Sequence, residues 1–583
     1  MATQLNDWLS IDKVSGTGNA QITLTASSYS ELVDRATSIK IQAQSTNAIL
    51  NVRQTALVPS ATLDSYETTA YRASTYSNGI TSNVPWTAVV NDNWITIDKT
   101  QGHSGYTPLS ITVDATTETR NGSIVFNAEG VVLTLQIYQI YDLKKAYFWI
   151  EFEEANGTIS GLTNDYTDMY HSFDGVTWEA TPNTLSMGNN TLVYFKNNSK
   201  KISLNIKFNS NAKIGGDLSS LTNMAGSCCY ELFKDNTYLT DASELILPWD
   251  TLKYDCYCFM FYNCTSLKTA PELPATTLAN SCYNAMFQGC TSLTTAPELP
   301  ATTLADYCYE YMFQGCTSLT TAPELPATTL AVCCYRFMFR NCTSLTTAPA
   351  VLPATVLTSN CYEAMFANCT SLTTAPELPA TTLYEYCYDA MFANCTSLTT
   401  APALPATTLT VNCYYSMFRN CTSLTTAPAL PATTLIGNCY SHMFYGCTSL
   451  TTAPALPATT LADSCYHSMF GNCTSLTTAP ALPATTLAKG CYFQMFWDCT
   501  SLTTAPALPA TTLADSCYHS MFRGCTSLNY VKMLATDISA SNCLDYWVEN
   551  VAPTGTFIKH PDANIPTGIS GIPSGWTVKT ATE

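Results

Sequence analysis

The four residues Cys-Thr-Ser-Leu recur along the second half of this chain at a nearly constant spacing. The interval between copies is 26 residues, except for one interval of 27 that contains an inserted Val351. The phrase "CTSL" begins at Cys264, Cys290, Cys316, Cys342, Cys369, Cys395, Cys421, Cys447, Cys473, Cys499 and Cys525. A fixed period of this size is typical of a solenoid, in which each unit buries its apolar side against the next.

Within one unit, the apolar positions predict a short strand and a short helix. In the unit that begins at Cys290, Leu293 is followed by Pro297 and Pro300. Proline lacks an N–H and favours extended backbone, so we expect a short parallel strand around residues 293–295 and then an irregular extended segment. The following "ADYCYEYMFQG" places Met and Phe four and five residues after Cys and ends at Gly, which predicts a short helix.

Degenerate copies of the unit stand at both ends of the array. "CCYELFKDNTYL" carries Asn236 where the second cysteine should stand, and "NCLDYWVENV" carries Trp547 near the methionine position. Terminal coils of a solenoid need such changes because one of their faces meets no neighbour. We therefore predict a solenoid over residues 228–551.

This block resembles the BspA-like leucine-rich repeats of bacterial surface proteins, whose units carry "MFxxCxSL". The resemblance spans about residues 256–528. It implies a leucine-rich-repeat solenoid with one short strand and one short helix per 26-residue coil. The tail, residues 552–583, resembles a short closing module that follows such repeats in gut Bacteroidetes.

The first 227 residues contain no cysteine and hold a second, weaker repeat. "DWLSIDKVSG" matches "NWITIDKTQG", "AQITLTA" matches "LSITVDA", and "LNVRQ" matches "LQIYQ". Alternating apolar residues between Gly, Asn and Ser turns indicate antiparallel strands in a sandwich. The Trp…Gly…Arg…Gln pattern resembles the BACON domain, an Ig-like sandwich of Bacteroidetes proteins and crAss-like phages.

The two BACON-like copies differ in length. Residues 58–142 include a strand, "NVPWTAVV", that has no counterpart in residues 1–57, so the first copy is predicted to be truncated and to expose an unpaired edge. Residues 143–227 predict a further β-rich module that seats the first coil, with a hairpin turn at Asp174-Gly175 in "SFDGVTWEA". The predicted fold class is therefore multidomain: all-β sandwiches followed by the solenoid.

The chemistry-bearing residues favour packing over catalysis. All 27 cysteines lie between Cys228 and Cys543, and we interpret them as buried free thiols, with scattered disulfides or metal ligation as alternatives. Neither a C-x-x-C pair nor an H-E-x-x-H motif occurs, so we expect no metal, no cofactor and no catalytic residue. The Asn of each "NCT" fits a glycosylation sequon, but we interpret it as a left-handed turn residue that alternates with Gly.

The residues after "CY" and after "MF" vary most between units, and we expect them to point outward from the helices. Aromatic side chains can stack on sugar rings, and arginine adds hydrogen bonds. The candidate ligand-binding residues are Arg336, Tyr415, Tyr445, Phe493 and Trp497, of which Trp497 is the strongest because exposed tryptophan is uncommon. The alternative interpretation is that these positions have simply drifted.

The net charge and the absence of targeting patterns limit the ligands and the compartment that we expect for this protein. A net charge of −18 argues against nucleic acid, and no segment is apolar enough for membrane insertion. The N-terminal sequence has no signal-peptide pattern, and free thiols suit a reducing compartment. We therefore expect a non-enzymatic phage virion fibre or tail-associated protein that binds a bacterial surface glycan or protein.

The alternative to the virion is a Bacteroidetes cell-surface adhesion or glycan-binding protein. In the virion hypothesis, residues 1–57 dock onto another virion protein or a second copy, which allows a homo-oligomer, and the solenoid points away from this anchor.

Overall fold

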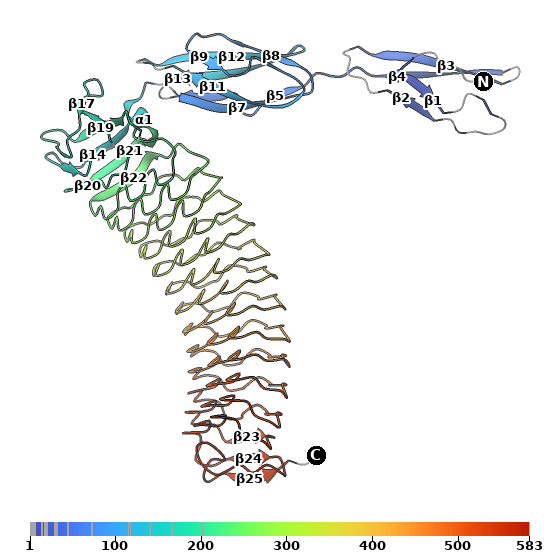
Figure 1. Cartoon of the computed structure of the whole chain (residues 1–583), viewed down its shortest axis with the longest axis vertical. Coiled ribbons are helices and arrows are strands. Elements are labelled where there is room, and N and C mark those ends of the chain that lie inside the picture. Colours follow the sequence, from blue (N-terminus) through green and yellow to red (C-terminus); the bar gives the residue numbers. More distant parts are fainter. Residues whose placement is uncertain are drawn as a thin grey trace. The chain divides into compact units, whose positions relative to one another are not determined.

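The computed structural model describes residues 7–581 except for 13–14, 17–20, 22, 28–32, 44–45, 71–73, 115, 117, 140, 165–166 and 201. It divides into two compact units, Met1–Asp142 and Leu143–Glu583. The fold class is confirmed, because sandwich strands occupy the first unit and the repeats follow in the second (Figure 1).

The complete sandwich lies in the first unit. Its two sheets have the strand orders β10-β8-β12-β13-β6 and β5-β7-β11-β9. The strands are β5 (Ala61–Leu63), β6 (Glu67–Ala70), β7 (Ser74–Ser82), β8 (Trp86–Val90), β9 (Ile95–Ile97), β10 (Gln101–Gly102), β11 (Gly105–Val113), β12 (Arg120–Ala128) and β13 (Val131–Gln139). Alternate residues of β12 and β13, such as Phe126 and Leu135, face inward and are completely buried.

The same unit contains a partial copy of this sandwich. Strands β1 (Leu9–Ile11) and β2 (Leu24–Ala26) pair with each other, as do β3 (Arg35–Ala43) and β4 (Thr46–Gln54). Ile39 faces Leu50 in this copy as Ile124 faces Leu135 in the complete one. Leu50 is 40% exposed whereas Leu135 is 0% exposed. Among the described residues, this copy has no paired counterparts of β5, β6, β7 and β8, so fewer strands cover β4.

Both copies contain the same packed Trp–Arg–Gln group. The guanidinium carbon of Arg35 lies 4.5 Å from the ring centroid of Trp8, and that of Arg120 lies 4.3 Å from that of Trp94. In each copy, the arginine Nε donates to a glutamine Oε1, at 3.0 Å in the first copy and 2.8 Å in the second. The sequence pattern therefore specifies a packed group that both copies share.

The second unit begins with helix α1 (Leu143–Ala146) and a β-module whose main sheet has the order β17-β16-β19-β14-β21-β22, beside a smaller sheet β18-β15-β20. The bounds are β14 (Phe148–Phe152), β15 (Thr158–Ser160), β16 (Met169–Ser172), β17 (Glu179–Ala180), β18 (Thr184–Ser186), β19 (Leu192–Asn197), β20 (Lys207–Phe208), β21 (Ala212–Asp217), the 3₁₀ turn η1 (Leu218–Ser220) and β22 (Leu239–Ile246).

This module connects directly to the coils. Strand β22 pairs with β21 in parallel, and its Asp241 forms the next parallel bridge with Thr269. The predicted hairpin is present, since β16 pairs with β17 around a turn in which Asp174 Oδ1 accepts from the N–H groups of Val176 and Thr177. These hydrogen bonds lower the pKa of Asp174 to about 2.

Each coil contains single parallel bridges where a short strand was expected. Threonines of successive "LTTAP" segments pair, as in Thr269 with Thr295 and Thr374 with Thr400. The strand is reduced to this bridge because proline follows two residues later and lacks the N–H that a longer ladder would need.

The predicted helix in each coil is wrong. The "CY…MF" segment instead forms successive tight turns, in which every fourth residue has positive φ, as in Ser281 (55°), Ala285 (50°) and Gly289 (76°). Alternate N–H groups bond within the turn and to the next coil: Met286 N donates to Tyr283 O at 3.2 Å, and Phe287 N donates to Met312 O at 3.0 Å. A helix would use all of these donors internally and leave the coils unlinked.

Identical side chains stack through the interior of the solenoid. The Phe of each "MF" stacks on its neighbours at centroid distances such as 5.7 Å (Phe366–Phe392) and 5.6 Å (Phe392–Phe418). The Tyr of each "CY" forms a parallel stack, as in Tyr388 with Tyr414 at 5.7 Å. Both stacks are buried, so they extend one hydrophobic core along the coils.

All 27 cysteines are free and buried. The cysteine of each "CTSL" donates its S–H to the carbonyl of the "MF" phenylalanine in the preceding coil, as in Cys395 Sγ to Phe366 O at 3.1 Å. Burial raises the pKa of the Cys395 thiol to about 12, so it remains protonated and able to donate. The cysteine is thus a small core residue whose S–H hydrogen bond links its coil to the preceding one.

The end coils follow the predicted degeneracy. Asn236 replaces the thiol and donates to Ile206 O at 3.1 Å. Trp547 occupies the methionine position, is completely buried, and donates to Gly571 O at 2.8 Å. The closing sheet consists of β23 (Tyr530–Met533), β24 (Thr556–Lys559) and β25 (Thr577–Thr580), all parallel. In the described part of the chain, none of the helices has the length and apolar character to cross a membrane.

Candidate ligand-binding surface

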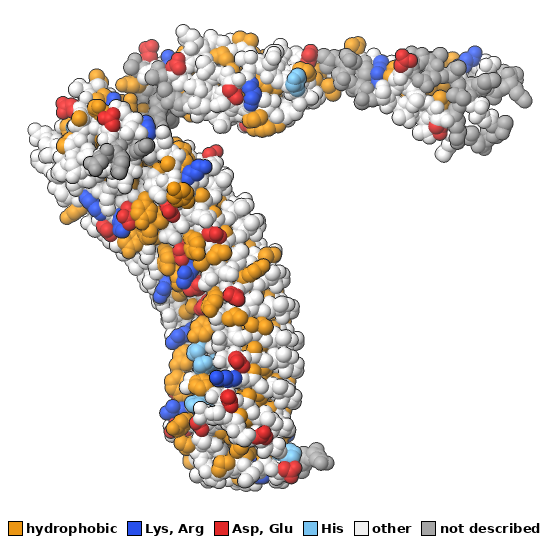
Figure 2. All heavy atoms as spheres, in the orientation of Figure 1, with side chains coloured by type: hydrophobic (Ala, Val, Ile, Leu, Met, Phe, Trp, Pro, Cys, Tyr) orange, Lys and Arg blue, Asp and Glu red, His pale blue; other side chains and the backbone are white. Residues whose placement is uncertain are grey.

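The coils differ mainly at the three positions before the cysteine of "CY" and at three positions that lie two, three and six residues after it. The later three carry the sequence-predicted residues. We call the surface formed by the three positions after the cysteine the variable face. Figure 2 shows hydrophobic, histidine and arginine side chains gathered along one side of the coils. The arginines of the coils, Arg336, Arg340, Arg419 and Arg523, all belong to this face.

The variable face is charged in its N-terminal half. Arg336 lies between two glutamates, with its Nη1 3.5 Å from Glu310 Oε1 and its Nε 2.9 Å from Glu363 Oε2. Burial, and to a smaller extent the Glu363 carboxylate, raise the pKa of Asp389 in the next coil to about 7. The guanidinium of Arg336 therefore neutralises neighbouring acids and is not free for a ligand.

The C-terminal half of the face carries a stack of rings. His442 and His467 lie 4.8 Å apart by ring centroids, His467 and Phe493 lie 4.7 Å apart, and Phe493 and His519 lie 4.5 Å apart. Tyr415 extends the stack, 5.5 Å from His442. Phe493 thus has a ring against each side, so it cannot offer a free face to a sugar.

Burial also decides the charge of these histidines. It lowers the pKa of His442 to about 4, with His467 and Arg419 adding smaller effects, and it lowers the pKa of His467. Both imidazoles are therefore neutral at neutral pH. Because burial raises the pKa values of the nearby "CY" cysteines, such as Cys439, no thiolate is present here to act as a nucleophile.

Tyr445 and Trp497 form a pair on this face with a different geometry. Their ring centroids lie 6.3 Å apart, although the coil that contains Gly471 stands between them. Asn472 Nδ2 donates to Tyr445 Oη at 2.6 Å, and the guanidinium carbon of Arg419 lies 5.3 Å from the Tyr445 centroid. Trp497 is half-buried and not exposed as expected, because Tyr445 leans across Gly471 toward it.

The structure thus places all five sequence-predicted residues on one face, but gives them different neighbours. It brings Tyr445 and Trp497 together, encloses Arg336 and Phe493 among neighbours, and sets Tyr415 at the end of the ring stack. Sequence reasoning did not select Gly471, Asn472 or Arg419 as site residues. The signal for Gly471 was a glycine at a position where the flanking coils carry Tyr and Trp.

The asparagines of "NCT" form a ladder beside the variable face. Asn341, Asn368, Asn394 and Asn420 all have positive φ, as do Gly289 and Gly315 at the equivalent position. The amides of the last three each donate to the preceding asparagine, as in Asn394 Nδ2 to Asn368 Oδ1 at 2.8 Å. The interpretation as left-handed turn residues is confirmed, and the ladder gives these side chains a second role in linking coils.

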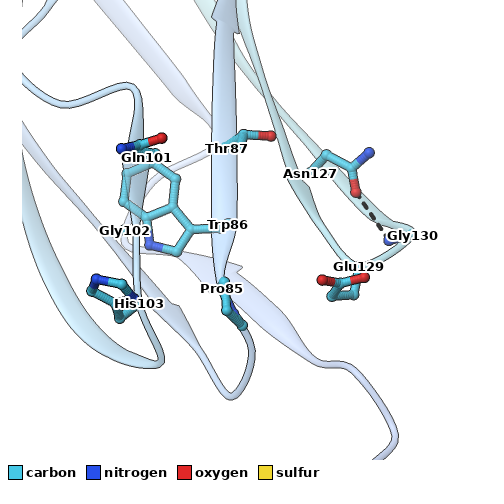
Figure 3. Close-up of a pocket in the computed structure, with 9 residues that line it drawn as sticks. All are labelled: Pro85, Trp86, Thr87, Gln101, Gly102, His103, Asn127, Glu129 and Gly130. Carbon is cyan, nitrogen blue, oxygen red and sulfur yellow. Dashed lines mark hydrogen bonds between the residues drawn. The ribbon is translucent and has the colours of Figure 1, made fainter. Parts of the chain in front are cut away.

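A separate hollow of about 600 Å³ lies on the complete sandwich (Figure 3). Trp86 is buried against Gly102, where a Cβ would lie 2.6 Å from the indole Nε1. Asn127 Oδ1 accepts from Gly130 N at 2.9 Å on the other side of β8, next to Glu129. Figure 3 shows His103 and Glu129 on opposite sides of this strand, so they do not form an acid–base pair.

Comparisons with known proteins match both halves of the chain. The BACON model, described as "Putative binding domain, N-terminal", matches residues 3–55 and 84–139. The model "BspA type Leucine rich repeat region (6 copies)" matches residues 238–364, 325–451 and 438–543 and so covers more than half of the chain. A search of curated proteins found no match.

Among solved structures, a similarity was found to a Bacteroides ovatus GH5 xyloglucanase in complex with an XXXG heptasaccharide. The sequence identity is 19%, and the match covers 18% of this chain and 23% of that chain with a TM-score of 0.15. This similarity is too limited to carry an argument about function.

Proposed function

Because the chain belongs to the BspA-type leucine-rich repeat family and also carries BACON domains, we propose that it is a non-enzymatic adhesion protein whose solenoid binds a bacterial surface ligand. Both matched families are binding or repeat modules and not catalytic ones. The geometry agrees, since the histidines of the variable face stack on rings and the cysteines are buried core residues.

The observation that carries this proposal is the distribution of variation among the coils. Interior positions repeat almost without change, whereas the variable face differs from coil to coil, with Arg336 between two glutamates in one half and a stack of four His and Phe rings in the other. Packing alone would need no such change, because identical coils already bury a continuous core. A surface that varies on a constant scaffold is suited to ligand recognition.

We place the protein in a phage virion, with the bacterial cell surface as the competing location. The support is the large number of buried free thiols, which fold without misoxidation in a reducing cytoplasm, where virions assemble. Mass spectrometry of purified particles and of bacterial envelope fractions distinguishes the two locations. Recovery in envelope fractions alone would contradict the virion assignment and leave the adhesion function intact.

The adhesion function is tested by attachment of the labelled full-length protein to bacterial cells. We expect the double substitution Tyr445→Ala with Trp497→Ala to reduce attachment about tenfold, because it removes two large contact rings. The matched control is Tyr384→Ala, since Tyr384 is 50% exposed but lies three residues before its "CY" cysteine, off the variable face. Equal attachment of the double variant and the control would refute the assignment of the variable face.

A further inference from the structure

One aromatic surface spans three coils of the variable face. Tyr445, Gly471 and Trp497 occupy the same position in successive coils, six residues after "CY". A Cβ at Gly471 would lie 2.9 Å from Tyr445 Cδ2, so a larger residue would push the Tyr445 ring outward. The glycine therefore allows the two rings to approach to 6.3 Å.

Polar groups with unused hydrogen-bonding capacity surround this aromatic pair. Arg419 is exposed and, within the described ranges, has no ion pair, whereas Arg523 pairs with Glu549 at 2.6 Å. The indole N–H of Trp497 has no hydrogen-bond partner among the described residues. Tyr445 Oη accepts from Asn472, which fixes the ring and leaves its O–H available to donate.

The charges around the pair are unequal at its two ends. Arg419 lies beside Tyr445, and the nearby imidazoles of His442 and His467 are neutral at neutral pH because burial lowers their pKa values. Asp498 follows Trp497 at the other end and lies close to Gly524. Arg523 lies near Asp498 but is paired with Glu549, so the cation that is left for an anionic group is Arg419 at the Tyr445 end.

We propose that Arg419, Tyr445 and Trp497 bind an acidic saccharide, with its carboxylate or sulfate on Arg419 and a sugar ring on the aromatic pair. This proposal rests on the adhesion function and names its ligand class. The C–H face of a pyranose is apolar and packs on aromatic rings, while its hydroxyl oxygens accept from the Trp497 and Tyr445 donors. Guanidinium binds carboxylate and sulfate through charge-assisted hydrogen bonds.

The test uses polymers that differ mainly in charge. Biolayer interferometry would compare the full-length protein on polygalacturonate and its methyl ester, and on dextran sulfate and dextran. The variants are Arg419→Gln, Trp497→Ala and the charge-matched control Lys268→Gln, because Lys268 is exposed on the threonine-rich face. Low and high salt would separate the contribution of charge.

We expect binding to the acidic member of at least one pair to exceed binding to its neutral member by about tenfold or more. Arg419→Gln should abolish this preference and retain the weaker binding to the neutral polymer, whereas Trp497→Ala should weaken both. Lys268→Gln should behave as wild type. Equal binding within both pairs, absence of binding to all four polymers, or equal behaviour of Arg419→Gln and Lys268→Gln would overturn the proposal.

The cell-attachment assay separates this outcome from failure of the adhesion function. If attachment still depends on Tyr445 and Trp497 while the acidic preference is absent, only the ligand class is wrong. If attachment is also independent of both rings, the proposed function of the variable face fails with it.

Discussion

Removing one phenyl ring from the interior stack should loosen the solenoid locally. Phe392 is completely buried, and its ring lies 5.7 Å from that of Phe366 and 5.6 Å from that of Phe418, nearly parallel to both. Substitution of a core phenylalanine by alanine costs about 3–5 kcal/mol. We expect a loss near the upper end of this range for Phe392→Ala, because stacking is lost on both faces.

The loss should be concentrated near the altered coil, because the stability of stacked repeats is a sum of terms for each repeat and its neighbours. A loss of about 5 kcal/mol raises the local opening constant by between about 10³ and 10⁴. Hydrogen exchange should therefore accelerate most at the inter-coil amides beside the cavity. These include Phe392 N, which donates to Met417 O, and Phe366 N, which donates to Met391 O.

Hydrogen-exchange mass spectrometry of the full-length protein measures this effect peptide by peptide. Phe337→Ala is the matched control, because Phe337 lies outside the interior stack on the variable face and is only half-buried. We expect the control to accelerate exchange less than about tenfold, and Phe392→Leu to fall between the two. Acceleration spread evenly over all coils, or no larger for Phe392→Ala than for Phe337→Ala, would refute the nearest-neighbour argument.

Two further predictions concern the charged half of the variable face and the partial sandwich. Burial raises the pKa of Asp389 to about 7, so this carboxyl binds a proton more readily in the folded protein than in the unfolded chain. Asp389 therefore destabilises the folded protein increasingly as pH rises from about 4 to about 7. Asp389→Asn should therefore raise Tm at pH 8 but not at pH 4, and an equal gain from the exposed control Glu385→Gln would contradict this cause. Deletion of residues 1–57 removes the sheet that carries the exposed Ile49 and Leu50. Circular dichroism should show that β5–β13 and the solenoid still fold, whereas incorporation into particles should be abolished. Normal incorporation would exclude the anchoring role.

The period of the repeat predicted which residues form the core, but not the backbone that carries them. Met and Phe four and five residues after Cys suit a helix, yet a chain of four-residue turns produces the same spacing. Positive φ at positions such as Ser281 and Ala285 is set by inter-coil hydrogen bonds, and a propensity argument over one coil does not contain these bonds. The recurrence of Asn or Gly eight residues after Ser281 was interpreted as one left-handed turn residue at the end of a helix, and not as the last of three positions with positive φ.

The interior tyrosines were missed for a related reason. The apolar pattern of one coil does not include the Tyr of "CY", whose hydroxyl usually favours the surface. In the structure, Tyr388 and Tyr414 are nearly completely buried, because stacking on an identical ring in each neighbouring coil is available only in a repeat.

The candidate site was predictable as a set of positions but not as a geometry. Variation among coils identified the variable face, since a changing residue in a constant array cannot be required for packing. The same variation could not show that Phe493 is enclosed by His467 and His519, because that depends on which rings meet across coils. The accessible pair became visible only when Gly471 placed Tyr445 beside Trp497.

This arrangement separates folding from recognition within each coil. The phenylalanine stack and the cysteine donors supply contacts that every coil repeats, so these contacts do not depend on the outward side chains. A substitution on the variable face therefore changes ligand contacts while it leaves the inter-coil hydrogen bonds in place, as long as the turn position with positive φ is preserved. The solenoid can thus present charged groups in one half and rings in the other on a single backbone geometry, and an elongated ligand would meet both in a fixed order.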